Sequence, residues 1–120
     1  MPRILEGRRI MIVEDEYLIA MEVQDLLTDL GAEVVGPFGR LAPAIEAVSR
    51  EQLHGALLDV RLDGETIDEI AEALVARGVP VLLATGYDKE QLPLSLQHLP
   101  RVRKPYDESE LRGLLERAYR

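Results

Sequence analysis

The sequence predicts an α/β fold built around a doubly wound parallel sheet. Short apolar runs alternate with amphipathic helical segments along the chain, which is typical of βα units whose sheet is covered on both faces. Five such units fit into the 120 residues, a length typical of one domain. Acidic or polar residues follow the apolar runs, at the edge where open α/β sheets bind ligands.

Five strands are expected from runs of aliphatic and β-branched residues bounded by polar residues or glycine. They cover residues 9–13, 33–36, 54–59, 79–84 and 101–103. The segment Gly36-Pro37-Phe38-Gly39 is interpreted as the turn that ends the second strand. Five strands in a chain of this length favour the flavodoxin-like strand order 2-1-3-4-5.

Five helices are expected between and after the strands, from apolar residues at helical spacing. They cover residues 16–30, 42–51, 66–77, 89–98 and 107–119. Gly31 and Gly78 are expected to end the first and third helices, and Asp107 or Ser109 to cap the last. The fourth helix has the weakest pattern because Pro93 interrupts it.

Composition and charge exclude several functional classes. The net charge of −8 repels phosphate backbones, so no nucleic-acid binding is expected. The absence of cysteine excludes disulfides, thiol catalysis and Cys-ligated zinc, and it fits a cytoplasmic location. No apolar run approaches the ~20 residues that cross a bilayer, and the first ten residues lack the apolar stretch of a signal peptide. We therefore expect no signal peptide and no membrane association. We expect one domain over residues 1–120.

Chemically active side chains follow the predicted strands. They are Glu14, Asp15 and Glu16 after the first strand, Asp59 at the end of the third, Thr85 after the fourth and Lys104 after the fifth. Clustered carboxylates need a cation, and hard oxygen ligands suit Mg²⁺. Asp59 is the best-placed nucleophile for phosphoryl transfer. Thr85 and Lys104 would stabilise the phosphoryl oxygens.

This set of residues resembles the receiver (response-regulator) family of two-component systems, and the resemblance covers the whole chain. It implies that Asp59 is the phosphoacceptor and that Asp15 is a direct Mg²⁺ ligand. Glu14 would act through a metal-bound water, and the backbone carbonyl of Arg61 would complete the protein's ligands.

The resemblance also assigns roles after the fourth and fifth strands. Thr85 and Lys104 would bind phosphoryl oxygens, and the Lys104–Pro105 peptide bond would be cis. Many receivers have an aromatic switch residue three positions before the lysine, where this chain has Arg101. The usual route by which phosphorylation is read out is therefore not expected here.

The family resemblance implies partners as well. A sensor histidine kinase or a phosphotransfer protein would donate the phosphoryl group. The domain would promote only its own phosphorylation and dephosphorylation, so it is not expected to be an enzyme. A downstream protein would bind the face made by the fourth helix, fifth strand and fifth helix (89–98, 101–103 and 107–119).

A narrower resemblance lies in residues 80–87, whose sequence PVLLATGY is similar to the PFxFATGY pattern of the FATGUY receivers. These are mostly single-domain proteins linked to kinases of the HWE type. Val81 and Leu83 stand where the pattern has phenylalanine. Arg61 and Tyr87, two residues after the acceptor and two after the threonine, are expected to slow loss of the phosphoryl group.

Two other functional classes stay open. The first is a binding module that keeps the fold but works without phosphorylation. The second is a flavodoxin-like enzyme or cofactor carrier, which would need a phosphate-binding loop after the first strand. The acids found there would repel a flavin phosphate, so this class is disfavoured.

Overall fold

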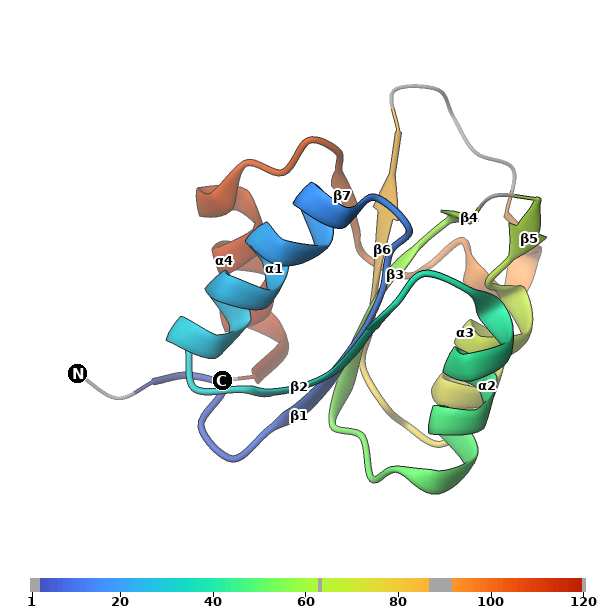
Figure 1. Ribbon diagram of the computed structural model, residues 1–120, viewed down its shortest axis with the longest axis horizontal. Helices are drawn as coiled ribbons and strands as arrows, with labels where there is room; N and C mark the ends of the chain where they lie inside the picture. The colour runs from blue at the N-terminus through green and yellow to red at the C-terminus, as the bar shows by residue number, and fades with distance from the viewer. Residues whose placement is uncertain (1–2, 63, 87–91, 120) are drawn as a thin grey trace.

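A parallel sheet of five strands forms the centre of the computed structural model, which describes residues 3–62, 64–86 and 92–119 (Figure 1). The strand order is β2-β1-β3-β6-β7, and every neighbouring pair is parallel. The strands are β1 (Arg9–Val13), β2 (Glu33–Phe38), β3 (Gly55–Asp59), β6 (Val81–Thr85) and β7 (Arg101–Arg103). Because β6 and β7 are the fourth and fifth strands of this sheet, the predicted flavodoxin-like order 2-1-3-4-5 is confirmed.

Helices cover both faces of the sheet (Figure 1). Helices α1 (Tyr17–Asp29) and α4 (Glu108–Tyr119) lie on one face, and α2 (Leu41–Arg50) and α3 (Asp68–Ala76) lie on the other. Successive strand residues point to opposite faces. In β1, Ile10 and Ile12 therefore join the core under α1 and α4, whereas Met11 and Val13 join the core under α2 and α3. Burial on both faces explains why the strands are apolar throughout.

The second strand continues further than expected, so the turn predicted over residues 36–39 is wrong. Strand β2 runs to Phe38, and its pairing with β1 shifts between Met11 and Val13. Gly36 has φ +102°, and a Cβ at this position would lie 2.9 Å from the Ile12 carbonyl oxygen. The glycine accommodates the irregularity, and pairing resumes beyond it.

A short hairpin that the sequence did not reveal follows β3. Strand β4 (Arg61–Leu62) pairs antiparallel with β5 (Glu65–Thr66). Helix α3 consequently begins at Asp68, two residues later than predicted. Strands of two residues carry too little alternation to be detected from the sequence.

The predicted fourth helix is wrong in its described part. Residues 89–91 lie outside the described residues, and after them only a 3₁₀ turn, η1 (Leu94–Leu96), is present. Pro93 precedes this turn with extended backbone angles (φ −53°, ψ 149°). Its ring removes a backbone donor and disfavours helical geometry in the residue before it.

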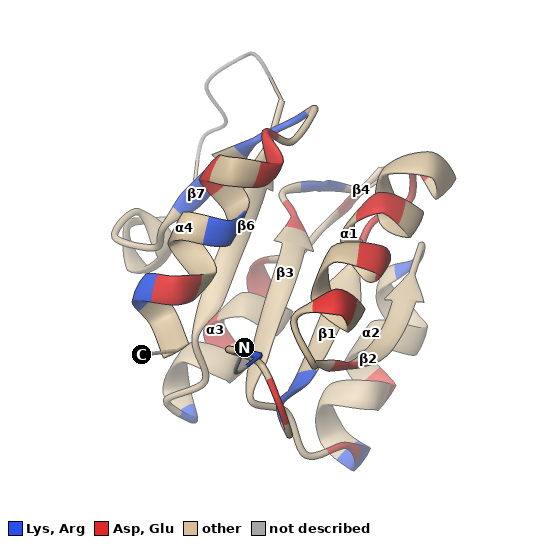
Figure 2. Cartoon of the chain, turned by 90° about the vertical axis from the view of Figure 1, so that its left-hand side faces the viewer, with Lys and Arg blue, Asp and Glu red and all other residues tan. Residues whose placement is uncertain are grey.

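Acidic residues dominate the outer surface of α1, as Figure 2 shows for the side of the molecule that carries α1 and α4. Glu22, Asp25 and Asp29 are exposed on this helix. Within residues 3–62, 64–86 and 92–119, no helix is both long and apolar enough to pass through a lipid bilayer.

Candidate functional site

Two buried carboxylates mark the carboxyl edge of the sheet. Glu14 follows β1 and Asp59 is the last residue of β3. They are only 4% and 2% exposed, and the exposed Asp15 lies beside them. Carboxylate oxygens of these three residues lie within 4.8 Å of one another. Burying acids this close together is costly unless a cation and hydrogen bonds compensate.

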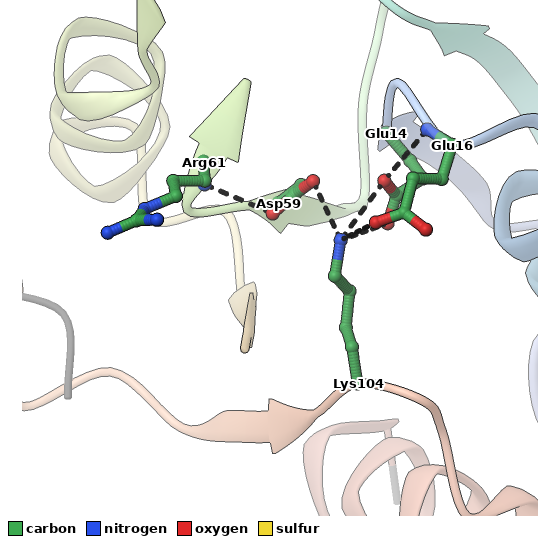
Figure 3. Close-up of polar contacts among 5 residues, drawn as sticks. All are labelled: Glu14, Glu16, Asp59, Arg61 and Lys104. Atoms are coloured by element: carbon green, nitrogen blue, oxygen red, sulfur yellow. Dashed lines mark hydrogen bonds and ion pairs between the residues drawn. The ribbon is translucent and has the colours of Figure 1, made fainter. Parts of the chain in front are cut away.

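Lys104 provides a cation at this edge (Figure 3). Its Nζ lies 3.0 Å from Asp59 Oδ2, 3.3 Å from both carboxylate oxygens of Glu14 and 3.2 Å from Glu16 Oε1. The Lys104 side chain is only 12% exposed. Its backbone N–H donates to the Thr85 carbonyl at 2.7 Å. This bond joins the ends of β6 and β7 and holds the lysine beside the acids.

Backbone N–H groups provide further donors to the acids. The Arg61 N–H donates to Asp59 Oδ1 at 3.0 Å, and the Glu16 N–H donates to Glu14 Oε2 at 3.1 Å. The guanidinium of Arg61 extends away from Asp59 (Figure 3). Tyr87, the second residue expected to slow dephosphorylation, lies outside the described residues.

Burial and mutual repulsion change the titration of the site. Burial, reinforced by the contact with Asp59, raises the pKa of Glu14 to about 7, although the Glu16 N–H and Lys104 oppose this rise. Burial disfavours the Lys104 ammonium, but the carboxylates of Asp59 and Glu14 outweigh it and raise the pKa of Lys104 above its usual value. Lys104 therefore stays protonated at neutral pH, whereas Glu14 exchanges a proton there.

The donor set suits a hard divalent cation. Three carboxylates that offer oxygen atoms within 4.8 Å of one another match the ligand preference of Mg²⁺ and Ca²⁺. A divalent ion would offset the repulsion between Glu14 and Asp59, which adds to the effect of burial on the pKa of Glu14. Residues Glu14, Asp15 and Asp59 therefore fit the metal site expected from the sequence.

The structure brings the predicted residues to one edge of the sheet. Thr85 ends β6, and its neighbour Ala84 pairs with Asp59 of β3. The Lys104–Pro105 peptide bond is cis, as expected. The roles of all these residues toward a metal or a phosphoryl group stay predictions, including those of Thr85 and of the Arg61 carbonyl.

Tyr106 lies near the site and was missed by the sequence analysis. Burial, followed by the charges of Glu14, Asp59 and Glu16, raises the pKa of its phenol above the usual value. Its position in the sequence, two residues after Lys104, could have indicated that it lies near the site. Arg101, at the expected switch position, is exposed and donates to the Gln97 carbonyl at 3.3 Å.

Known proteins of similar sequence and structure were found, although no protein-family model matches the chain. The phyllosphere-induced regulator PhyR of Methylorubrum extorquens is 35% identical over 86 residues, which are 69% of this chain and 32% of that protein. The chain spans less than half the length of the curated relatives it matches.

Solved structures match over nearly the whole chain. SdrG from Sphingomonas melonis Fr1 has a TM-score of 0.81 at 35% identity, covering 92% of this chain and 95% of SdrG. The response regulator REC domain of Erythrobacter litoralis PhyR has a TM-score of 0.80 at 32% identity, covering 94% of this chain and 90% of that domain.

Proposed function

The chain belongs to the receiver-domain family of response regulators, and from this premise we propose that Asp59 accepts a phosphoryl group from a histidine kinase or a phosphotransfer protein. The observation that carries the proposal is the environment of Asp59. This buried carboxylate lies between the Lys104 ammonium and the Arg61 N–H, with two further acids beside it. A buried carboxylate is costly unless it is paired and hydrogen-bonded, and the groups that pair with Asp59 are those that phosphoryl transfer needs.

The proposed reaction is transfer from a phosphohistidine to Asp59. A carboxylate oxygen of Asp59 forms a bond to phosphorus, the P–N bond breaks, and its electron pair leaves with the imidazole. Phosphoryl transfer depends mainly on positioning and on neutralising charge on the equatorial oxygens. The Lys104 ammonium, the Thr85 hydroxyl and the Arg61 N–H are the groups proposed to supply this stabilisation.

Mg²⁺ is the proposed cofactor. Its direct ligands would be Asp15, Asp59 and the Arg61 carbonyl, and Glu14 would act through a metal-bound water. The three carboxylates already lie together. When bound, the ion supplies positive charge that offsets the repulsion between the acids and an incoming phosphoryl group. Lys104 supplies part of that charge from the protein itself.

We further propose that the chain belongs to the FATGUY subgroup and that its donor is a kinase of the HWE type. The sequence PVLLATGY over residues 80–87 supports this assignment. The domain would promote only its own phosphorylation and dephosphorylation, in the cytoplasm. It would pass the signal to a protein bound at the face of η1, β7 and α4.

The proposal is tested by incubating the protein with acetyl phosphate and Mg²⁺ and measuring its mass. We expect the wild type to gain the mass of one phosphoryl group and Asp59→Asn to gain none. Lys104→Met and Asp15→Asn should slow the gain by a factor of about 100 or more, because each removes charge stabilisation of the transferred group.

The matched control is Asp25→Asn, which removes an exposed acid from α1 away from the site. It should be phosphorylated like the wild type. A wild type that gains no mass under these conditions would favour the phosphorylation-independent binding module. A gain that persists in Asp59→Asn would place the acceptor elsewhere.

A further inference from the structure

The β4–β5 hairpin begins immediately beyond Asp59. Arg61 pairs with Thr66 and Leu62 pairs with Glu65 in this hairpin. Leu62 is 3% exposed and packs into the core under α2 and α3. The Arg61 backbone is therefore held at two points, by its hydrogen bond to Asp59 Oδ1 and by its pairing with β5.

The side chain of Glu65 joins the hairpin to α2. Its Oε1 accepts a hydrogen bond from the Leu41 N–H at 3.1 Å, and Leu41 is the first residue of α2. The N-cap residue, Arg40, makes no side-chain capping bond, and the first turn of α2 contains no acidic residue. Glu65 thus provides, from another segment, the negative charge and the acceptor that a helix N-terminus favours.

The beginning of α2 is also close to the loop after β1, which carries Glu14 and Asp15. The Glu14 N–H donates to the Phe38 carbonyl at 2.8 Å, three residues before α2 begins. A Cβ on Gly39 would lie 3.7 Å from the Asp15 Cα. The N-terminus of α2 therefore adjoins the loop after β1 and, through Glu65, the loop after β3.

We propose that Glu65 is a positioning residue that couples the state of Asp59 to the N-terminus of α2; this inference rests on the function proposed above. In the acyl phosphate, one Asp59 oxygen is bonded to phosphorus and the other is a neutral carbonyl oxygen. The charge-assisted hydrogen bond from the Arg61 N–H is then weakened or transferred to a phosphoryl oxygen. A shift of the Arg61 backbone then moves its partners in β5. This movement alters the hydrogen bond between Glu65 and the Leu41 N–H.

The same connection affects metal binding before any phosphorylation. The Arg61 carbonyl is a proposed Mg²⁺ ligand, and Glu65 restrains the hairpin that fixes the Arg61 backbone. Residues that orient a metal ligand contribute about tenfold or more to affinity. We therefore expect Glu65→Ala to raise the Kd for Mg²⁺ about tenfold, whereas Glu65→Gln, which keeps an acceptor oxygen, should restore most of the affinity.

The test combines Mg²⁺ titration with amide NMR spectra of the full chain. In the wild type and in Glu65→Gln, Mg²⁺ followed by acetyl phosphate should shift the Leu41 amide resonance. In Glu65→Ala this shift should be lost. Glu46→Ala, which removes an exposed acid from the middle of α2, should behave like the wild type.

A second variant breaks the same hydrogen bond from its other side. Leu41→Pro removes the N–H donor at the first position of a helix, where proline is tolerated, and the preceding Arg40 already has extended angles (φ −138°, ψ 153°). It should weaken Mg²⁺ binding as Glu65→Ala does. This variant keeps the test valid if Glu65→Ala does not fold.

The outcomes separate this inference from the proposed function. An unchanged Leu41 shift and an unchanged Mg²⁺ affinity in Glu65→Ala would overturn the coupling while leaving phosphorylation of Asp59 intact. A wild type that binds Mg²⁺ but takes no phosphoryl group would contradict the phosphoacceptor role, and the Mg²⁺ titration would still decide the coupling.

Discussion

A single ammonium group, that of Lys104, contacts three carboxylates at the edge of the sheet. Two of them, Glu14 and Asp59, are buried, so their interaction with Lys104 is screened far less than that of a surface pair. The third, Glu16, is exposed and contributes little. Lys104 thus neutralises part of a site that otherwise concentrates negative charge.

Stability of the metal-free protein should depend on the protonation of Glu14. Its pKa of about 7 lies above the ordinary value of 4.5, so between these pH values the folded state binds a proton that the unfolded state does not. Stability is then greatest at the lower pH and falls as pH rises through about 7. We expect a loss of about 2–3 kcal/mol in the free energy of unfolding between pH 5 and pH 8.

Urea unfolding in EDTA at several pH values measures this dependence. The Glu14→Gln variant, which cannot titrate at this position, should show a flatter profile, and both proteins keep the same two histidines. Parallel profiles for wild type and variant would show that Glu14 does not bind the extra proton.

At the scale of elements, the sheet strands and the four long helices could be predicted from the sequence, whereas the two-residue strands β4 and β5 could not. Helices α1 and α4 have enough turns for an apolar stripe to be visible, and glycine ends α1 at Gly31 with φ +102°. Strands β4 and β5 have two residues each and depend on contacts with the rest of the molecule. The extension of β2 through Gly36 depends on pairing with β1. The pattern of apolar residues within the segment does not predict this pairing.

The end of α4 is fixed to the beginning of β3 by a close contact. The Tyr119 hydroxyl donates to the His54 carbonyl at 2.8 Å, and a Cβ on Gly55 would overlap that hydroxyl. Gly55→Ala should therefore displace Tyr119 and lower the free energy of unfolding by about 2 kcal/mol. Tyr119→Phe, which loses only the hydrogen bond, should cost about 1 kcal/mol.

A double-mutant cycle measured by urea unfolding tests this explanation. In Gly55→Ala/Tyr119→Phe the overlapping oxygen is absent, so the double variant should lose less stability than the sum of the two single changes. Strict additivity would mean that the hydroxyl does not occupy the space beside Gly55.

At the scale of the whole molecule, the net charge of −8 acts in two ways. Acids spread along α1 (Figure 2) repel one another, and any salt weakens this repulsion. The acids at the sheet edge form a local cluster, where a bound divalent ion would stabilise the folded state by mass action. The two effects differ in their dependence on the type of ion.

Melting temperatures at matched ionic strength separate the two effects. NaCl should raise the Tm of the wild type and of Asp15→Asn by similar amounts, because it screens the whole surface. MgCl₂ should add a further increase of several degrees in the wild type only, equivalent to about 2–3 kcal/mol when the ion is at 100 times its Kd. An equal response of both proteins to MgCl₂ would argue against a site that includes Asp15.

The position of the site could be predicted from the order of elements alone. Parallel strands end at one edge, so Glu14, Asp59 and Lys104 had to meet there once five βα units were identified. The contacts among them depend on side-chain conformation, and the three carboxylate partners of Lys104 were not foreseen. The hydrogen bond between Glu65 and Leu41 joins the two-residue strand β5 to the start of α2, and no pattern in the sequence predicts this contact.

The contacts of Lys104 also determine what activation involves. In the structure its ammonium already takes the place of an external counter-ion for Asp59 and Glu14. Under the proposed function, an incoming metal and phosphoryl group would have to compete with this internal partner, so activation would be an exchange of ion pairs. Withdrawal of the metal would return the acids to Lys104, which would give the resting protein a defined, partly neutralised site even when divalent ions are scarce.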